Sequence, residues 1–517
     1  MFASGRKPSW FKAIYLAPVL AIVALMAWAF ASPVGAGPDD DYHLVSAWCS
    51  VVDGDHCSTG STPESRVVPE AVVESPCFAQ DPLESAACQE ALDFTGETTT
   101  DTRRGNFVGA YPPVYYAVMS VFVGDDIVGS AMLMRLFNIL VFVGLTTALF
   151  VLLRPERRQA LVWGWAITTV PMGLFLIASN NPSGWAVTGV GTAWIALLGY
   201  LESVGPRKWL LGAIFAVGTI MAAGSRADAA IYAVLGIGAV FVLTFPRTRE
   251  GWKKYALDAI LPVALAIVCL FFFLTSRQSQ SGTGGFGGGS SVEADVGQAS
   301  GAEALTGFGQ FAYNLLNVPF LWAGNFGEWG LGWLDTSMPA AVTYAAIASF
   351  IVVGFLGLAR LWGRKLFVVL AAGLTLWLLP VYVLSAGGDI IGESVQPRYV
   401  LPLIVLFGGL LVLSKRGRPM AFTRAQAVLV VAALSVANFL ALHFNMRRYI
   451  TGVDEAGLNL DSGIEWWWDI SMSPMFVWII GSAAYAGLLG LLVRHLGRQS
   501  PDLSEARQRS DRAIAEH

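Results

Sequence analysis

Residues 13–32 read AIYLAPVLAIVALMAWAFAS. This run has no charged side chain and matches the roughly 20 residues that a helix needs to cross a hydrocarbon core of about 30 Å. We expect a helix because lipid cannot satisfy the exposed edge of a strand. The run ends in Ala29-Phe30-Ala31, which resembles a signal-peptidase site. It is longer than the apolar part of a usual signal peptide, so a retained membrane helix is the preferred interpretation.

The rest of the chain repeats this pattern. Of its 517 residues, 55% are hydrophobic and 14% are charged, whereas soluble proteins carry about 25% charged residues. Apolar runs occur at 13–32, 130–153, 159–178, 183–201, 208–224, 226–245, 256–275, 340–360, 365–385, 398–414, 423–443 and 474–495. The sequence therefore predicts an all-α integral membrane protein with about 12 transmembrane helices.

Charge is segregated between the two sides of the predicted membrane. Twenty-four of the 33 Lys and Arg residues fall on one side, and 29 of the 37 Asp and Glu residues fall on the other. Basic loops face the cytoplasm by the positive-inside rule. We therefore expect a plasma-membrane protein with both termini in the cytoplasm, and a functional face on the acidic, extracytoplasmic side.

The predicted spans divide the chain into six parts. The largest external segment is a loop of about a hundred residues. A second external loop opens with a Gly- and Ser-rich stretch at 281–291 that is a linker or a flap. The parts are the cytoplasmic N-terminus with the first span at 1–32, the first loop at 33–129, a bundle at 130–275, the second loop at 276–339, a bundle at 340–496 and a cytoplasmic tail at 497–517.

Four of the five cysteines lie in the first external loop: Cys49, Cys57, Cys77 and Cys88. An even number of cysteines in an oxidising compartment indicates two disulfides, for which three pairings exist. Pairing of sequence neighbours, Cys49 with Cys57 and Cys77 with Cys88, is our preferred interpretation.

The most informative polar motif is Pro38-Asp39-Asp40-Asp41-Tyr42-His43, a few residues after the first span. Three adjacent carboxylates repel one another, so at least one should have a raised pKa or a cationic partner. A solvated acidic turn is the alternative. The span holds this motif at the membrane surface, which favours a functional site with His43 as a further member.

Other polar residues mark the same face. Tyr111 and Tyr115 open a segment that could line a lipid groove or anchor at the interface. Arg226 could bind an anion, or pair with Asp228 and cap helices. Arg398 begins a span, where its planar guanidinium suits a phosphate unless it is only a snorkelling anchor. Arg135 lies inside a span, where a charge is costly and is usually functional or paired.

Four motifs in order resemble a family of bacterial multi-pass proteins of formerly unknown function that looks like a branch of the GT-C lipid-linked glycosyltransferases. They are Pro38–His43, Tyr111-Pro-Pro-x-x-Tyr116, Gly332-Trp333-Leu334-Asp335 and Val395-Gln396-Pro397-Arg398-Tyr399. The chain departs from the pattern in having Asp39-Asp40 in place of Asp-Glu and Pro397 in place of a small residue. The resemblance covers about 13–414.

This resemblance implies transfer of a sugar from a polyprenyl-phosphate donor to an extracytoplasmic glycan, lipid or protein acceptor, with inversion. Asp39 or Asp40 would be the base and His43 a positioning group. Binding of substrate and lipid phosphate would involve Arg398, Arg226, Tyr399, Tyr111, Tyr115 and Asp335. A divalent metal on Asp39 and Asp40 is an alternative. Membrane lipids are expected partners, and nucleic acid is not. The competing interpretation is a transporter or flippase of a lipid-linked glycan.

Overall fold

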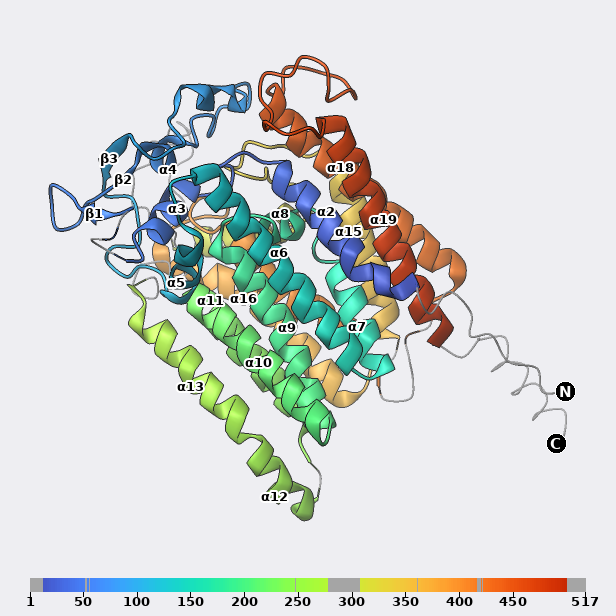
Figure 1. Cartoon of the computed structure of the whole chain (residues 1–517). Helices are drawn as coiled ribbons and strands as arrows, with labels where there is room; N and C mark the ends of the chain where they lie inside the picture. The colour runs from blue at the N-terminus through green and yellow to red at the C-terminus, as the bar shows by residue number, and fades with distance from the viewer. Residues whose placement is uncertain are drawn as a thin grey trace, which may run out of the picture.

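The apolar runs form long helices in a computed structural model, which describes residues 13–51, 54, 56–246, 248–277, 307–359, 361–415, 420 and 422–499. These helices lie side by side in one bundle, and the short strands gather with α3 and α4 at one end of it (Figure 1). The protein is thus mostly helical, as the sequence predicts.

Eight helices of the described chain are long and apolar enough to cross a membrane. They are α6 (Ile127–Leu152), α9 (Pro182–Glu202), α10 (Pro206–Ser225), α11 (Ala227–Thr244), α15 (Ala340–Leu358), α16 (Gly363–Gly387), α18 (Arg424–Ile450) and α19 (Pro474–Gln499). A ninth span results if α12 (Arg249–Asp258) and α13 (Ile260–Thr275), which meet at 48°, are counted together.

Two further apolar helices are shorter than these spans. One is Ile14–Phe30, which comprises η1 (Ile14–Leu16) and α2 (Ala17–Phe30), and the other is α17 (Pro397–Val412). The expected run at 159–178 is divided between α7 (Pro155–Ala166) and α8 (Met172–Ile177). Pro171 cannot donate a backbone hydrogen bond, so a continuous helix is interrupted there. Twelve complete spans therefore remain a prediction.

Helix α9 is at the centre of the bundle. Every residue from Pro182 to Tyr200 is buried, as expected for a helix that is apolar on all sides. Small residues let its neighbours approach closely. A Cβ added at Gly189 would lie 2.5 Å from the Gly218 carbonyl oxygen of α10, so the contact between α9 and α10 requires a glycine.

Two boundaries differ from the sequence prediction. The segment expected as the second loop, 276–339, contains α14 (Phe308–Gly324). Its apolar residues are interrupted by Asn and by Pro319, which hid the helix from a search for continuous apolar runs. The stretch at 281–291 lies outside the described residues. Helix α18 extends to Ile450, beyond the predicted end at 443.

The first external loop is a small folded unit rather than a simple connector. Its strands β1 (Ser58–Thr59), β2 (Arg66–Pro69) and β3 (Thr99–Thr102) form an antiparallel sheet in the order β1-β2-β3. Ser58 pairs with Val67, and Val67 pairs with Asp101. The loop also contains α3 (Asp40–Trp48), α4 (Glu70–Glu74), η2 (Ala86–Ala91), α5 (Val114–Met119) and η3 (Ser120–Phe122). These strands were not predicted, because they have only two to four residues each.

Two disulfides stabilise this loop. The structure contains Cys49–Cys57 and Cys77–Cys88, which are the pairings of sequence neighbours. Cys269 is a free, buried cysteine.

We expect loss of the second disulfide by the double change Cys77→Ser/Cys88→Ser to destabilise the protein by about 2–4 kcal/mol, because the closed loop restricts the unfolded chain. Thermal unfolding of the purified protein measures this effect. Reductant should lower the unfolding temperature of wild type but not that of a variant without any of the four loop cysteines. An equal response in both would contradict a stabilising role.

Candidate functional site

The site is built around Asp39, which immediately precedes α3. Its backbone has φ +59°, a left-handed conformation that Asp and Asn adopt more readily than other non-glycine residues. Its carboxylate does not cap its own helix. Instead, Oδ2 accepts a hydrogen bond of 2.6 Å from Arg398, and Oδ1 accepts one of 3.1 Å from Arg104. The side chain keeps 20% of its surface exposed.

Two cations therefore set the charge of this carboxylate. Burial alone would raise the pKa of Asp39, but the cations Arg398 and Arg104 lower it below the usual value. Arg104 also donates to the Asp41 carboxylate. For Asp41, burial outweighs this pairing and raises the pKa. The triplet thus contains carboxylates in three different environments, and only Asp39 is paired with Arg398.

A small cavity adjoins this ion pair. Its lining includes Pro38 from the segment after α2, Met172 of α8, Gly332 and Leu334 from the segment before α15, and Gln396 and Arg398 at the start of α17. Leu334 has φ +67°, so a second non-glycine residue in a left-handed conformation lies at its edge. Three of the four predicted motifs thus meet at one cavity.

The fourth motif reaches the site through His43. The His43 ring nitrogen Nδ1 lies 2.9 Å from the Tyr116 hydroxyl, and the ring contacts Tyr111 edge-on at 5.4 Å. Burial lowers the pKa of His43 to about 3, with Arg398 among the cations that add to this effect and Asp39 opposing it. The imidazole is therefore uncharged near neutral pH. It makes no hydrogen bond to Asp39 in the described structure.

Asp40 occupies a different position from Asp39. It is fully buried, and its Oδ2 accepts a hydrogen bond of 2.9 Å from the Gly37 amide. Nearby, the buried Arg135 of α6 donates to the carbonyl oxygens of Ala29, Ser32 and Pro33 at 2.6–2.8 Å. Arg135 thus satisfies carbonyl groups where α2 ends, which explains how a charge is tolerated inside its span.

Burial raises the pKa of Asp40 to about 6, although Arg135 and the Gly37 amide oppose the change. Because this pKa exceeds the unfolded value of about 3.9, the folded state binds the proton more tightly. The resulting stabilisation is present below about pH 4 and is lost as the pH rises through about 6.

We therefore expect Asp40→Asn to unfold at a higher temperature than wild type at about pH 7.5 and to match it near pH 4. The difference should approach about 3 kcal/mol at the higher pH. Unfolding measured from about pH 4 to 8 tests this expectation. Asp125→Asn is the control, because that side chain is 90% exposed. Parallel profiles for Asp40→Asn and wild type would contradict it.

Arg226 lies beside the site but is already paired. Its Nε and Nη2 atoms donate to the two Asp228 oxygens at 2.9 Å, and the pair is buried. Its guanidinium also stacks on Tyr399 at 4.3 Å and on Tyr111 at 5.6 Å. The pairing that the sequence allowed is therefore the observed one, and Arg226 supports two aromatic walls of the site.

Two other candidate residues have structural partners. Asp335 accepts a hydrogen bond of 2.8 Å from Arg448 and one of 3.1 Å from the Gln80 amide, and its side chain is buried. Tyr115 is buried against Trp185. Both belong to motifs that reach the site, but their own side chains stabilise its surroundings.

The donor set at Asp39 and Asp40 does not fit a metal ion. Both Asp39 oxygens accept from arginines, and Asp40 points to the Gly37 amide. In the part of the chain that is described, no group of three His, Cys, Asp or Glu side chains is arranged to hold a metal.

Sequence reasoning missed several residues that hold the site together. Arg104 is one. Asn106 is another, because its side chain accepts from the Tyr111 amide at 2.8 Å and donates to the Tyr111 carbonyl at 3.0 Å. Asn181 is a third, because its side chain donates to the Pro38 carbonyl at 2.7 Å. Each of the last two is a single polar residue in a turn, which gives little signal in a sequence.

The fold and the site define a helical integral membrane protein with a buried, charged site at one end of its bundle. Residues 22–407 match the model of a family described as predicted membrane proteins, DUF2142. The chain belongs to this family. No curated protein and no solved structure matches this chain.

Proposed function

We propose that this protein is a GT-C-like glycosyltransferase that transfers a sugar from a polyprenyl-phosphate donor to an extracytoplasmic envelope acceptor. One observation carries the proposal. A partly exposed carboxylate, Asp39, lies between Arg104 and Arg398 beside a cavity lined by four separate segments. A base next to a phosphate-binding cation is what this reaction needs.

The proposed reaction begins when the donor phosphate competes with Asp39 for Arg398. Arg398 donates to Asp39 and Tyr399 through Nη2 alone, and its other donors have no hydrogen-bond partner in the described chain. A guanidinium binds phosphate through two parallel hydrogen bonds. Once Arg398 turns to the phosphate, Asp39 loses a cation that lowers its pKa and becomes a stronger base.

The transfer step then follows directly. An acceptor hydroxyl oxygen attacks the anomeric carbon and forms the new glycosidic bond, while its proton passes to Asp39. The bond from the anomeric carbon to the phosphate oxygen breaks, and its electron pair leaves with polyprenyl phosphate. Arg398 stabilises the charge that develops there. A single displacement inverts the anomeric centre. The uncharged His43 positions the acceptor.

The assignment of the base to Asp39 rather than Asp40 rests on access. Asp39 is 20% exposed, whereas Asp40 has no exposed surface. In this proposal the chain has twelve spans with both termini in the cytoplasm. The site then lies on the extracytoplasmic side of a bacterial plasma membrane. The basic loops support this orientation.

The test uses the purified full chain in detergent, with radiolabelled polyprenyl-phosphate sugars as donors and an envelope extract as acceptor. A glycosyltransferase releases free polyprenyl phosphate and labels the acceptor. A flippase does neither, but moves the donor across the bilayer of proteoliposomes. Deletion of the gene should also remove one glycosidic linkage from the envelope. The missing linkage would identify the product of the reaction. Translocation of the donor without release of polyprenyl phosphate would overturn the proposal in favour of a transporter.

A further inference from the structure

An apolar groove lies between α2, α6, α7, α8 and α19, and it plays no part in the proposed reaction. It has a volume of about 250 Å³, and its walls include Ala21, Leu25, Phe142, Leu161 and Leu489. Its rim is exposed, since Tyr15 and Val151 keep 66% and 65% of their surface. The groove therefore opens to the surroundings of the bundle.

The walls offer little to water. Two of the hydroxyls that line the groove donate to nearby carbonyls: Thr146 of α6 donates to Phe142, and Thr169, which follows α7, donates to Trp165. The hydroxyl of Tyr485, another lining residue, has no hydrogen-bond partner among the described residues, but a retained water needs two to four polar partners. Within a membrane, the alternative to water as an occupant of the groove is a lipid acyl chain.

The depth of the groove matches one leaflet. On α6 its lining runs from Phe142 to Val151, and on the first helix from Ile14 to Leu25. At a rise of 1.5 Å per residue these stretches cover about 14 and 16 Å. One half of a hydrocarbon core of roughly 30 Å has the same depth.

A cation without a carboxylate partner lies at one end of the groove. The Arg158 guanidinium lies 5.3 Å from the ring centre of the lining residue Phe150, and it donates to the carbonyls of Val151 and Leu153. Among the described ion pairs, none includes Arg158. Burial, with a contribution from Arg207, lowers its pKa. An anion at this place would therefore be stabilised.

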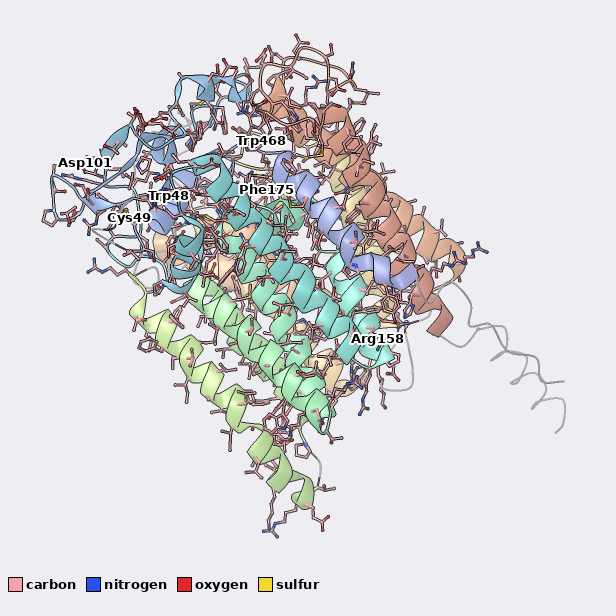
Figure 2. The ribbon with its side chains drawn as sticks, in the orientation of Figure 1. Trp48, Cys49, Asp101, Arg158, Phe175 and Trp468 are labelled. Atoms are coloured by element: carbon pink, nitrogen blue, oxygen red, sulfur yellow. A yellow bond between two sulfur atoms is a disulfide. The ribbon has the colours of Figure 1, made fainter. Side chains whose placement is uncertain are left out.

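This end is far from the candidate functional site. Figure 2 shows Arg158 at the opposite end of the bundle from Trp48 and Cys49 of the first external loop. The loops at the Arg158 end are the basic ones, which the positive-inside rule places in the cytoplasm. That leaflet carries anionic lipids.

We propose that the groove binds one acyl chain of an anionic phospholipid from the leaflet on the Arg158 side, with the lipid phosphate at Arg158. Three properties define the occupant. The apolar walls require a hydrocarbon chain, the length fits one leaflet, and the Arg158 guanidinium, which has no carboxylate partner among the described residues, selects a phosphate. The inference does not depend on the proposed glycosyltransferase activity.

The experiment measures lipids retained by the purified full chain, by native mass spectrometry after repeated detergent exchange. Wild type should retain one phosphatidylglycerol in preference to phosphatidylcholine when both are supplied in mixed micelles. Ala21→Phe on α2 and Thr147→Phe on α6, which each add bulk at a lining residue, should each reduce retention at least tenfold. Val19→Phe is the matched control, because Val19 is on the same helix but is 54% exposed and outside the groove.

Arg158→Gln separates the headgroup from the chain. It should abolish the preference for phosphatidylglycerol while a single lipid is still retained. Added phosphatidylglycerol should also raise the unfolding temperature of wild type and Val19→Phe but not of the two filled variants. Equal retention by filled variants and control, or equal retention of both lipids by wild type, would show only non-specific annular lipid and overturn the proposal.

Discussion

Asp39→Asn is expected to lower the rate of sugar transfer by about 10²–10⁴-fold, the usual contribution of a general base. Asn matches Asp in shape and also tolerates the left-handed backbone at φ +59°. It can accept hydrogen bonds from Arg104 or Arg398 but cannot take the proton of the acceptor. The loss should therefore appear in kcat, measured on the folded fraction, because Asp39→Asn also leaves the buried Arg398 without its carboxylate partner.

The comparison that makes this result informative is the neighbouring carboxylate. Asp40→Asn retains an acceptor for the Gly37 amide and should keep most of the activity, because Asp40 has no surface from which to reach a substrate. Asp125→Asn controls for a change of charge on the same loop. Release of polyprenyl phosphate is the readout, with expression matched.

Either alternative outcome has a definite meaning. If Asp40→Asn loses activity and Asp39→Asn does not, the base is Asp40, and the loop must open during turnover to expose it. If both single variants and the double variant remain active, neither carboxylate is a base. The ion pair with Arg398 would then be structural.

The sequence predicted the helical membrane architecture because long apolar runs are a strong signal and lipid restricts the alternatives. It was weaker wherever a helix is interrupted by polar residues or proline. α14 escaped notice because Asn and Pro319 divide its apolar residues, and the run at 159–178 contained a break at Pro171. Length and apolarity alone do not show where packing ends a helix.

The sequence analysis named the acidic motif and Arg398 as candidates for the site, but it did not name Arg104, the second cation beside Asp39. The charge pattern nevertheless contained a sign that Arg104 has a buried or paired side chain. All nine basic residues on the acidic side are Arg, and none is Lys. Most of them donate to backbone carbonyls or carboxylates: Arg104, Arg135, Arg226, Arg398, Arg447 and Arg448. An Arg that violates the charge segregation is thus a better predictor of a hydrogen-bonded partner than its local sequence.

The end of α18 illustrates what the sequence could not supply. Arg447 donates to the carbonyls of Gly457 and Asn459, and Arg448 donates to those of Phe78, Asp81 and Glu84. The helix continues to Ile450 because external loops surround these charges. Partners more than 350 residues away along the chain leave no local pattern.

Asp335→Asn is expected to destabilise the protein by about 3–5 kcal/mol. Asp335 and Arg448 form a buried ion pair of 2.8 Å in which the Arg448 side chain has no exposed surface. Removing one partner leaves a buried charge without compensation. The carbonyls of Phe78 and Asp81 still accept from Arg448, but they carry no full charge.

Thermal unfolding of the purified protein, followed by size-exclusion chromatography, measures this loss. Glu328→Gln is the control, because Glu328 is exposed in the segment between α14 and Asp335. Arg448→Met should be comparably unstable. The double variant should cost less than the two single losses together, because it leaves no unpaired buried charge.

The same variants separate a structural from a substrate-binding role for Asp335. Asp335 could serve only to hold the loop closed by Cys77–Cys88 against α18. In that case, the folded fraction of Asp335→Asn should transfer sugar with an unchanged KM below its unfolding temperature. If Asp335→Asn had the unfolding temperature of wild type and a raised KM, Asp335 would instead be a substrate-binding residue. In the proposed mechanism, Asp39, which is paired with Arg398, takes part in the chemistry, whereas Asp335, which is paired with Arg448, contributes to stability.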